Sequence, residues 1–206
     1  MSREQFTWGL SSGVIVLSVA AAFWMGLAAW TLGSSVLLIA AAPILVLSGL
    51  LIRIGFRLRR EATGFSRASL RNAPKGSSIR TIGAGFNIVN TTETVGIGLV
   101  GLICWRLNRL DLLWPLIGLV VSLHFLPLGW LFSVRPYYAL GVLGTAIALI
   151  SIVGFDGSAR TVAVGSGLGL VIGGCAAYLV ANATALADEA LRRNSPSPSR
   201  GEGRGL

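Results

Sequence analysis

The sequence predicts an all-α, polytopic bundle of about six transmembrane helices with both termini cytoplasmic. Hydrophobic residues make up 53% of the 206 residues and charged residues only 12%, whereas ordinary soluble domains are about 25% charged. The mean hydropathy is +0.75. This composition excludes an ordinary water-soluble globular protein.

Six long apolar stretches recur along the chain. A backbone in lipid must satisfy its own hydrogen bonds, which leaves helices or closed barrels, and a barrel would show alternating polarity instead of continuous apolar runs. Runs of about 20 apolar residues are long enough to cross the hydrocarbon layer. We therefore expect a transmembrane domain over residues 1–190, with spans near 8–30, 34–52, 82–104, 112–134, 137–155 and 161–186.

The distribution of cations predicts the orientation, because loops rich in Lys and Arg stay on the cytoplasmic side. With both termini inside, most of the 17 Lys and Arg residues fall on the inner side. Arg106, Arg109 and Arg160 are left on the outer side, where Asp111 partly offsets the first two.

Residues 53–80 are predicted to form a basic cytoplasmic loop that contacts anionic lipid head groups. Each cation near such a surface contributes about 1 kcal/mol. A pI near 11.2 would suggest nucleic acid in a soluble protein, but here topology accounts for it, and we expect no nucleic-acid partner. A dedicated site for a phosphate-bearing ligand is the alternative. The head-group candidates are Arg57, Arg59, Arg60, Arg67 and Arg71.

The last stretch, residues 191–206, holds Ser-Pro pairs followed by a glycine-rich segment and is expected to be disordered.

Small residues recur at every fourth position of the sixth span, which predicts close helix packing in lipid. Packing within one subunit is favoured over a homodimer seam, and neither alternative implies chemistry. The candidate packing residues are Gly165, Gly169, Gly173 and Ala177.

The sequence contains no glycine-rich phosphate loop, no C-x-x-C pair and no His-Glu-x-x-His helix, and it gives no reason to expect a cofactor. Cys104 and Cys175 lack metal-ligand spacing, so no metal site is expected. An enzyme is the less favoured class, because one acid and one histidine make a thin catalytic set.

Two ionisable residues fall deep inside predicted spans, Glu93 in the third and His124 in the fourth. Such residues are costly in a bilayer and often functional. Glu93 precedes the expected turn at Asn108 by about as many residues as His124 follows it, so a rise of about 1.5 Å per residue puts both near the bilayer midplane. If the two helices face each other, the side chains can pair.

A polar face accompanies Glu93 on the third span. Asn87, Asn90, Thr91 and Thr94 share one arc of the helix, and Glu93 lies about 60° beyond Asn90. Because this face is too polar for lipid, we expect it to point into the bundle. Ligand- or proton-binding candidates are thus Glu93, His124, Asn87, Asn90 and Thr94, and Pro127 is expected to kink the helix beside His124.

Three stretches of the sequence are the cluster from Asn87 to Glu93, His-Phe-Leu-Pro-Leu-Gly-Trp-Leu-Phe from His124, and Arg-Pro-Tyr-Tyr-Ala-Leu-Gly from Arg135. Together they resemble an uncharacterised group of bacterial six-helix integral membrane proteins. The resemblance covers residues 80–150 and implies a multi-pass protein of the bacterial cytoplasmic (inner) membrane. It implies no activity.

Two functions stay open on the sequence. A small-solute or proton-linked transporter would use Glu93 and His124 within a cavity that reaches the midplane. A non-catalytic membrane scaffold or accessory subunit would use the glycine stripe and the basic loop as contact surfaces, as a homo-oligomer or with a partner subunit. In that case the Glu93–His124 contact would only fix helix register.

Overall fold

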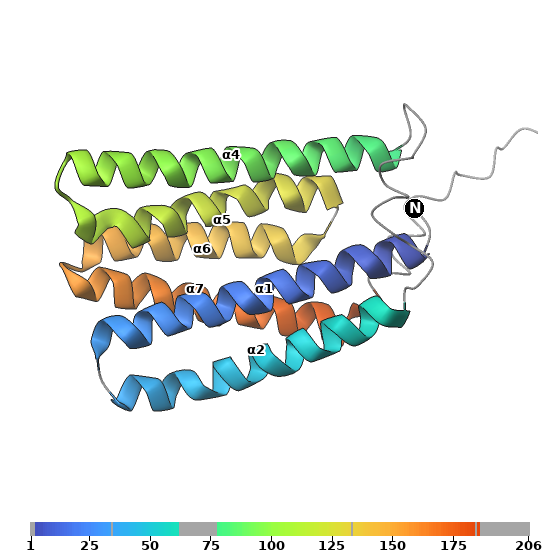
Figure 1. The fold of residues 1–206 in the computed structure, drawn as a ribbon, viewed down its shortest axis with the longest axis horizontal. Coiled ribbons are helices and arrows are strands. Elements are labelled where there is room, and N and C mark those ends of the chain that lie inside the picture. Colours follow the sequence, from blue (N-terminus) through green and yellow to red (C-terminus); the bar gives the residue numbers. More distant parts are fainter. Residues whose placement is uncertain (1–2, 34, 62–77, 133, 184, 186–206) are drawn as a thin grey trace, which may run out of the picture.

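The computed structural model describes residues 3–33, 35–61, 78–132, 134–183 and 185, with side chains from Ser11 onward except in 35–40, 58–59, 61 and 78–83. These residues form six long helices and one short 3-10 helix (Figure 1). The predicted all-α fold is therefore confirmed. The elements are α1 (Arg3–Leu32), α2 (Ser35–Glu61), α4 (Ser78–Arg106), η1 (Leu110–Leu112), α5 (Leu113–Phe132), α6 (Arg135–Gly154) and α7 (Ser158–Ala181).

Five of these helices are long and apolar enough to cross a membrane, so the chain is a multi-pass membrane protein. The five candidate spans are Ser11–Leu32, Ala84–Arg106, Leu110–Phe132, Arg135–Gly154 and Ser158–Ala181. The remaining helix, α2, has no charged residue between Ser35 and Ile52 and stays the predicted sixth span.

The helices run antiparallel and pack side by side, with α4 at one edge of the bundle and α2 at the other (Figure 1). Along the described chain, α7 contacts α1, α2, α5 and α6, whereas the main packing partner of α4 is α5. Consequently α7 is central and α4 is peripheral.

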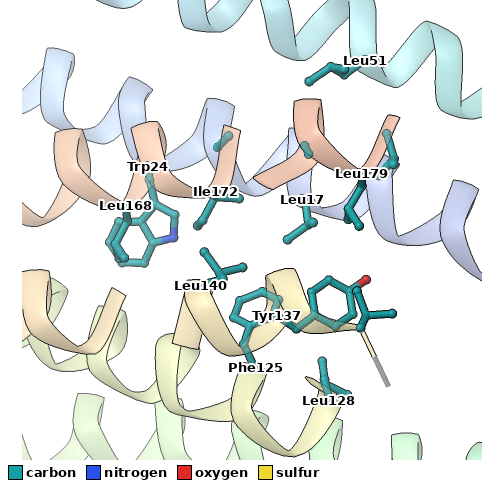
Figure 2. Packing of buried hydrophobic residues seen from close by; sticks show 14 of the residues in the cluster. Leu17, Trp24, Leu51, Phe125, Leu128, Tyr137, Leu140, Leu168, Ile172 and Leu179 are labelled. Atoms are coloured by element: carbon teal, nitrogen blue, oxygen red, sulfur yellow. The ribbon is translucent and has the colours of Figure 1, made fainter. Parts of the chain in front are cut away.

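The core lies between α1, α6 and α7, with α5 closing one side (Figure 2). Leu17, Leu140, Leu168 and Ile172 are fully buried there, and Trp24 is nearly so. Because lipid is as apolar as these side chains, van der Waals packing, and not exclusion from water, holds such a core together.

Three buried serine hydroxyls in the core are satisfied locally, whereas the hydroxyls of Ser48 and Thr145 have no partner among the described residues. Ser18 donates to the Val14 carbonyl, Ser122 to the Gly118 carbonyl and Ser151 to the Ile147 carbonyl, each at 2.7 Å. A hydroxyl bonded to a carbonyl one turn earlier needs no partner on another helix. These serines therefore act as small residues at helix contacts.

The start of the predicted basic loop is helical. α2 continues to Glu61, so residues 53–61 are helix and not loop, and Ser78–Arg80 already belong to α4. The prediction of a loop from residue 53 was wrong because hydropathy marks where lipid ends and not where a helix ends. No proline follows Pro43 in α2, and cations near a helix C-terminus are favourable for its dipole.

The antiparallel arrangement puts the start of α1, the end of α2, the start of α4, the α5–α6 turn and the end of α7 at one end of the bundle (Figure 1). We call this the basic end. Arg57, Arg60 and Arg135 are exposed at this end, and Arg53 is exposed about two turns before the end of α2. Which side of the membrane the basic end occupies stays a prediction, namely the cytoplasmic side.

Candidate polar site between α4 and α5

A tight turn joins α4 to η1 and α5 and sets the register of the two helices. Asn108 has a φ of 54°, a left-handed conformation that asparagine tolerates better than most residues. The Arg109 amide donates to the Cys104 carbonyl at 2.9 Å and ends α4. α5 then runs back along α4 and continues through Pro127 to Phe132.

This register brings Glu93 and His124 together. Glu93 Oε1 lies 3.4 Å from His124 Nδ1, and their side chains are 18% and 13% exposed. Both residues lie near the middle of their candidate spans, Ala84–Arg106 and Leu110–Phe132. An acid and an imidazole are therefore in ion-pair range at about the same depth.

The histidine tautomer follows from the neighbours of Nδ1. The Val121 carbonyl oxygen is 2.7 Å from Nδ1, and a carbonyl can only accept a hydrogen bond. Nδ1 must then carry a proton, and the Glu93 carboxylate oxygen lies 3.4 Å from the same nitrogen. In the neutral ring Nε2 is therefore the nitrogen without a proton.

The polar face of α4 does not point into the bundle. Asn87, Asn90, Thr91 and Thr94 are all exposed in the monomer, and only Glu93 is turned toward α5. The expectation of an inward face was wrong because a helical wheel gives the arc but not the neighbours. Only 6% of the span on α4 is buried, since α5 covers one side of it.

A hollow of about 390 Å³ lies at the end of the bundle opposite the basic end, lined by residues of α1, α7 and the turn between α6 and α7. None of its lining residues belongs to α4 or α5. The transporter hypothesis requires a cavity at the midplane, and this hollow is not that cavity. Its lining residues are Thr31, Leu32, Phe155, Ser158, Ala159, Val162 and Ala163.

The glycine stripe of the sixth span faces α1 of the same chain. A Cβ on Gly165 would lie 2.7 Å from the Trp24 carbonyl oxygen, and one on Gly169 would lie 3.2 Å from the Met25 amide nitrogen. At Gly173 the approach is looser, with Ala21 Cβ at 3.7 Å, and Ala177 is half-buried. The glycine stripe therefore packs against α1 of the same chain along the first turns of α7.

The head-group candidates are only partly visible. Arg57 and Arg60 are exposed on the last turns of α2. The side chain of Arg59, together with Arg67 and Arg71 and the whole tail 191–206, lies outside the described residues.

An ion-pair network at the end opposite the basic end was missed by the sequence reasoning. Arg160 is 11% exposed on its side chain and pairs with Asp111 and, at 3.0 Å, with Asp156, while Arg109 Nε pairs with Asp111 at 3.1 Å. The hydrogen bond to Asp111 also raises the pKa of Arg109.

This network, Arg109–Asp111–Arg160–Asp156, balances two cations with two carboxylates. It pairs Arg109 and Arg160, two of the three cations on the side predicted to be outside, with carboxylates. The sequence did contain a signal for this network. Asp111 lies beside the α4–α5 turn and Asp156 beside the α6–α7 turn, and because successive helices alternate in direction, both turns lie at the same end of the bundle.

Within the part of the chain that the structure describes, no group of three His, Cys, Asp or Glu side chains comes together as a metal site. Comparison of the chain with protein-family models, curated proteins and solved structures finds no match. The class that fold and composition define is a multi-pass, helical membrane protein.

Proposed function

We propose that this chain is a small membrane transporter, moving a small solute or protons, in which the Glu93–His124 pair takes up and releases a proton near the bilayer midplane. The observation that carries the proposal is the 3.4 Å contact between the Glu93 carboxylate and the imidazole of His124 on neighbouring spans. Ionisable groups held inside a membrane commonly mark proton or substrate pathways.

The chemistry of the pair suits proton exchange. Nδ1–H is held by the Val121 carbonyl, so an incoming proton binds Nε2 and the resulting imidazolium is stabilised by the carboxylate beside it. Neither the Glu93 nor the His124 side chain is fully buried. The pair can therefore alternate between a neutral imidazole and an ion pair without a change of helix register.

The setting of the proposal is the bacterial cytoplasmic membrane, with the basic end inside. The charge distribution supports that orientation. The bacterial setting is what the resemblance of residues 80–150 implies, and no comparison with known proteins adds to it.

A second candidate is a non-catalytic scaffold or accessory subunit. The observation in its favour is the position of the hollow, which lies between α1 and α7 and not beside Glu93. In this alternative the Glu93–His124 contact only fixes α4 against α5.

The two candidates differ in an experiment on reconstituted protein. Vesicles containing the parent chain, Glu93→Gln, His124→Ala or the control Thr92→Val receive an imposed pH gradient, and the internal pH is followed with a trapped dye. Thr92 is a suitable control because its side chain is exposed and its hydroxyl donates to the Ile88 carbonyl of the same helix. We expect flux in the parent and in Thr92→Val, and its loss in the other two at unchanged thermal stability.

Flux that survives both Glu93→Gln and His124→Ala would overturn the proposal. No flux in the parent, combined with a large loss of thermal stability in either variant, would leave the scaffold alternative.

A further inference from the structure

The outward surface of α4 is divided into two arcs of different chemistry. At about 100° per residue, Ile88, Val95 and Leu99 form an apolar arc that suits lipid, and they are 67%, 55% and 53% exposed. The adjoining arc is polar or small from Asn87 to Gly101, and the exposed Trp105 follows on the same arc. We call it the outer stripe, and it consists of Asn87, Asn90, Thr91, Thr94, Gly98 and Gly101.

The outer stripe lies on the side of α4 away from α5. A Cβ on Gly85 would meet Leu131 at 2.9 Å and one on Gly96 would meet Val120 at 3.0 Å, both on α5. A Cβ on Gly98 or Gly101 would meet nothing within 4 Å. α4 forms the edge of the bundle (Figure 1), so this side is accessible to another molecule.

Lipid is a poor occupant for the outer stripe. Thr94 donates its hydroxyl to the Asn90 carbonyl at 2.9 Å and needs nothing more, but the side-chain amides of Asn87 and Asn90 meet no hydrogen-bond partner among the described residues. In the hydrocarbon layer no water is present to satisfy them. Their occupant must therefore offer both donors and acceptors.

The same stripe on a second copy meets this requirement. An asparagine amide carries donors and an acceptor, so an asparagine can satisfy its own counterpart across a two-fold axis. Two copies inserted by the same charge rule have the same orientation, so their α4 helices run parallel and equal residues meet at equal depth. The stripe itself carries no charge that would repel its copy.

The spacing of the stripe also suits helix pairing. Asn87, Thr94 and Gly101 lie seven residues apart, and so do Thr91 and Gly98. A seven-residue repeat gives the left-handed crossing that is common in membrane bundles, and glycines let two backbones approach closely.

We propose that two copies of this chain associate through the outer stripes of their α4 helices. In the pair, the second copy covers Asn90, which lies about 60° from Glu93 around the same helix, so the second copy closes the open side of the Glu93–His124 contact. This last step rests on the proposed transport function, whereas the association itself does not.

Cysteine cross-linking of purified protein in lipid vesicles tests the association. Cys104 and Cys175 are first replaced by Ala, and single cysteines are then placed at Asn90, Thr94 or, as the control, Thr92, which is exposed on α4 outside the stripe. A disulfide needs Cα atoms within about 7 Å. We expect oxidation to give at least about tenfold more covalent dimer from the stripe positions than from Thr92→Cys, because only they meet their copies at this range.

A steric variant separates association from folding. Gly98→Leu adds a side chain where the monomer leaves open space, so it should lower the dimer fraction without lowering the melting temperature of the monomer, because leucine is a better helix former than glycine. Gly174→Leu, at an equally open glycine on α7, should leave the dimer fraction unchanged and should not lower the melting temperature either.

Equal cross-linking at Thr92 and Thr94, or a monomeric parent in vesicles, would overturn the inference. A dimer without proton flux would keep it and reject the transport function. Flux that persists in a fully monomeric Gly98→Leu variant would reject the claim that the second copy completes the site.

Discussion

Two helices of similar length, α7 and α4, use their small residues in different ways. In α7, 44% of the span is buried, and Gly165 and Gly169 bring it against the backbone of α1. In α4, 6% of the span is buried, and Gly98 and Gly101 face open space. The comparison teaches that a stripe of small residues indicates close packing but does not say whether the partner belongs to the same chain.

The largest effect is expected from Gly165→Ala. The new Cβ would lie 2.7 Å from the Trp24 carbonyl oxygen, and backbone cannot move aside as a side chain can. We expect the free energy of unfolding in mixed detergent micelles to fall by about 1–3 kcal/mol, as for other overpacked sites.

The matched control is Gly174→Ala, where nothing lies within 4 Å of the new atom. Alanine is the better helix former by about 1 kcal/mol, so this variant should be at least as stable as the parent. Equal losses in both variants would mean that the α1–α7 contact is looser than described.

A smaller effect is expected from Arg160→Gln, which removes the central cation of the Arg109–Asp111–Arg160–Asp156 network. This network ties η1, directly after α4, to the start of α7. Because Asp156 is nearly fully exposed, we expect a loss of only about 1 kcal/mol at low salt. Chemical unfolding at low and high ionic strength measures it.

Arg106→Gln serves as the comparison, since Arg106 is exposed and lies over the Trp105 ring at 5.9 Å. Its loss should be within about 0.5 kcal/mol. A loss from Arg160→Gln that does not shrink with salt would argue against an electrostatic cause.

The smallest effect is expected for the polar contact that joins α4 to α5. A double-mutant cycle of Glu93→Ala and His124→Ala at neutral pH should give a coupling free energy of about 0.6 kcal/mol, the average for interhelical hydrogen bonds in a membrane protein. A coupling above about 2 kcal/mol would instead make this contact the main attachment of α4.

The sequence correctly predicted the features that depend on position along a helix. The apolar runs predicted the helices, and the equal distances of Glu93 and His124 from Asn108 predicted their common depth. Direction around a helix was harder to predict. The arc of Asn87, Asn90 and Thr94 was correct, but its neighbour depends on the order in which six helices pack, and no local pattern encodes that order.

The ends of the helices could not be predicted from hydropathy. Arg57 and Arg60 look like loop residues by hydropathy, yet they continue α2, because water satisfies charged side chains as well on a helix as in a loop. The pairing of Arg160 with Asp111 needed only the topology, which brings their two turns to one end.

The contact between α1 and α7 also constrains the order of assembly. It is the most extensive helix–helix contact among the described residues, and it joins the first span to the last. During synthesis α1 and α2 enter the membrane before α7 has left the ribosome. The hairpin of α1 and α2 is therefore in the membrane before α7, its main packing partner, is inserted. Gly165 and Gly169 can contact the Trp24–Met25 backbone only after that insertion.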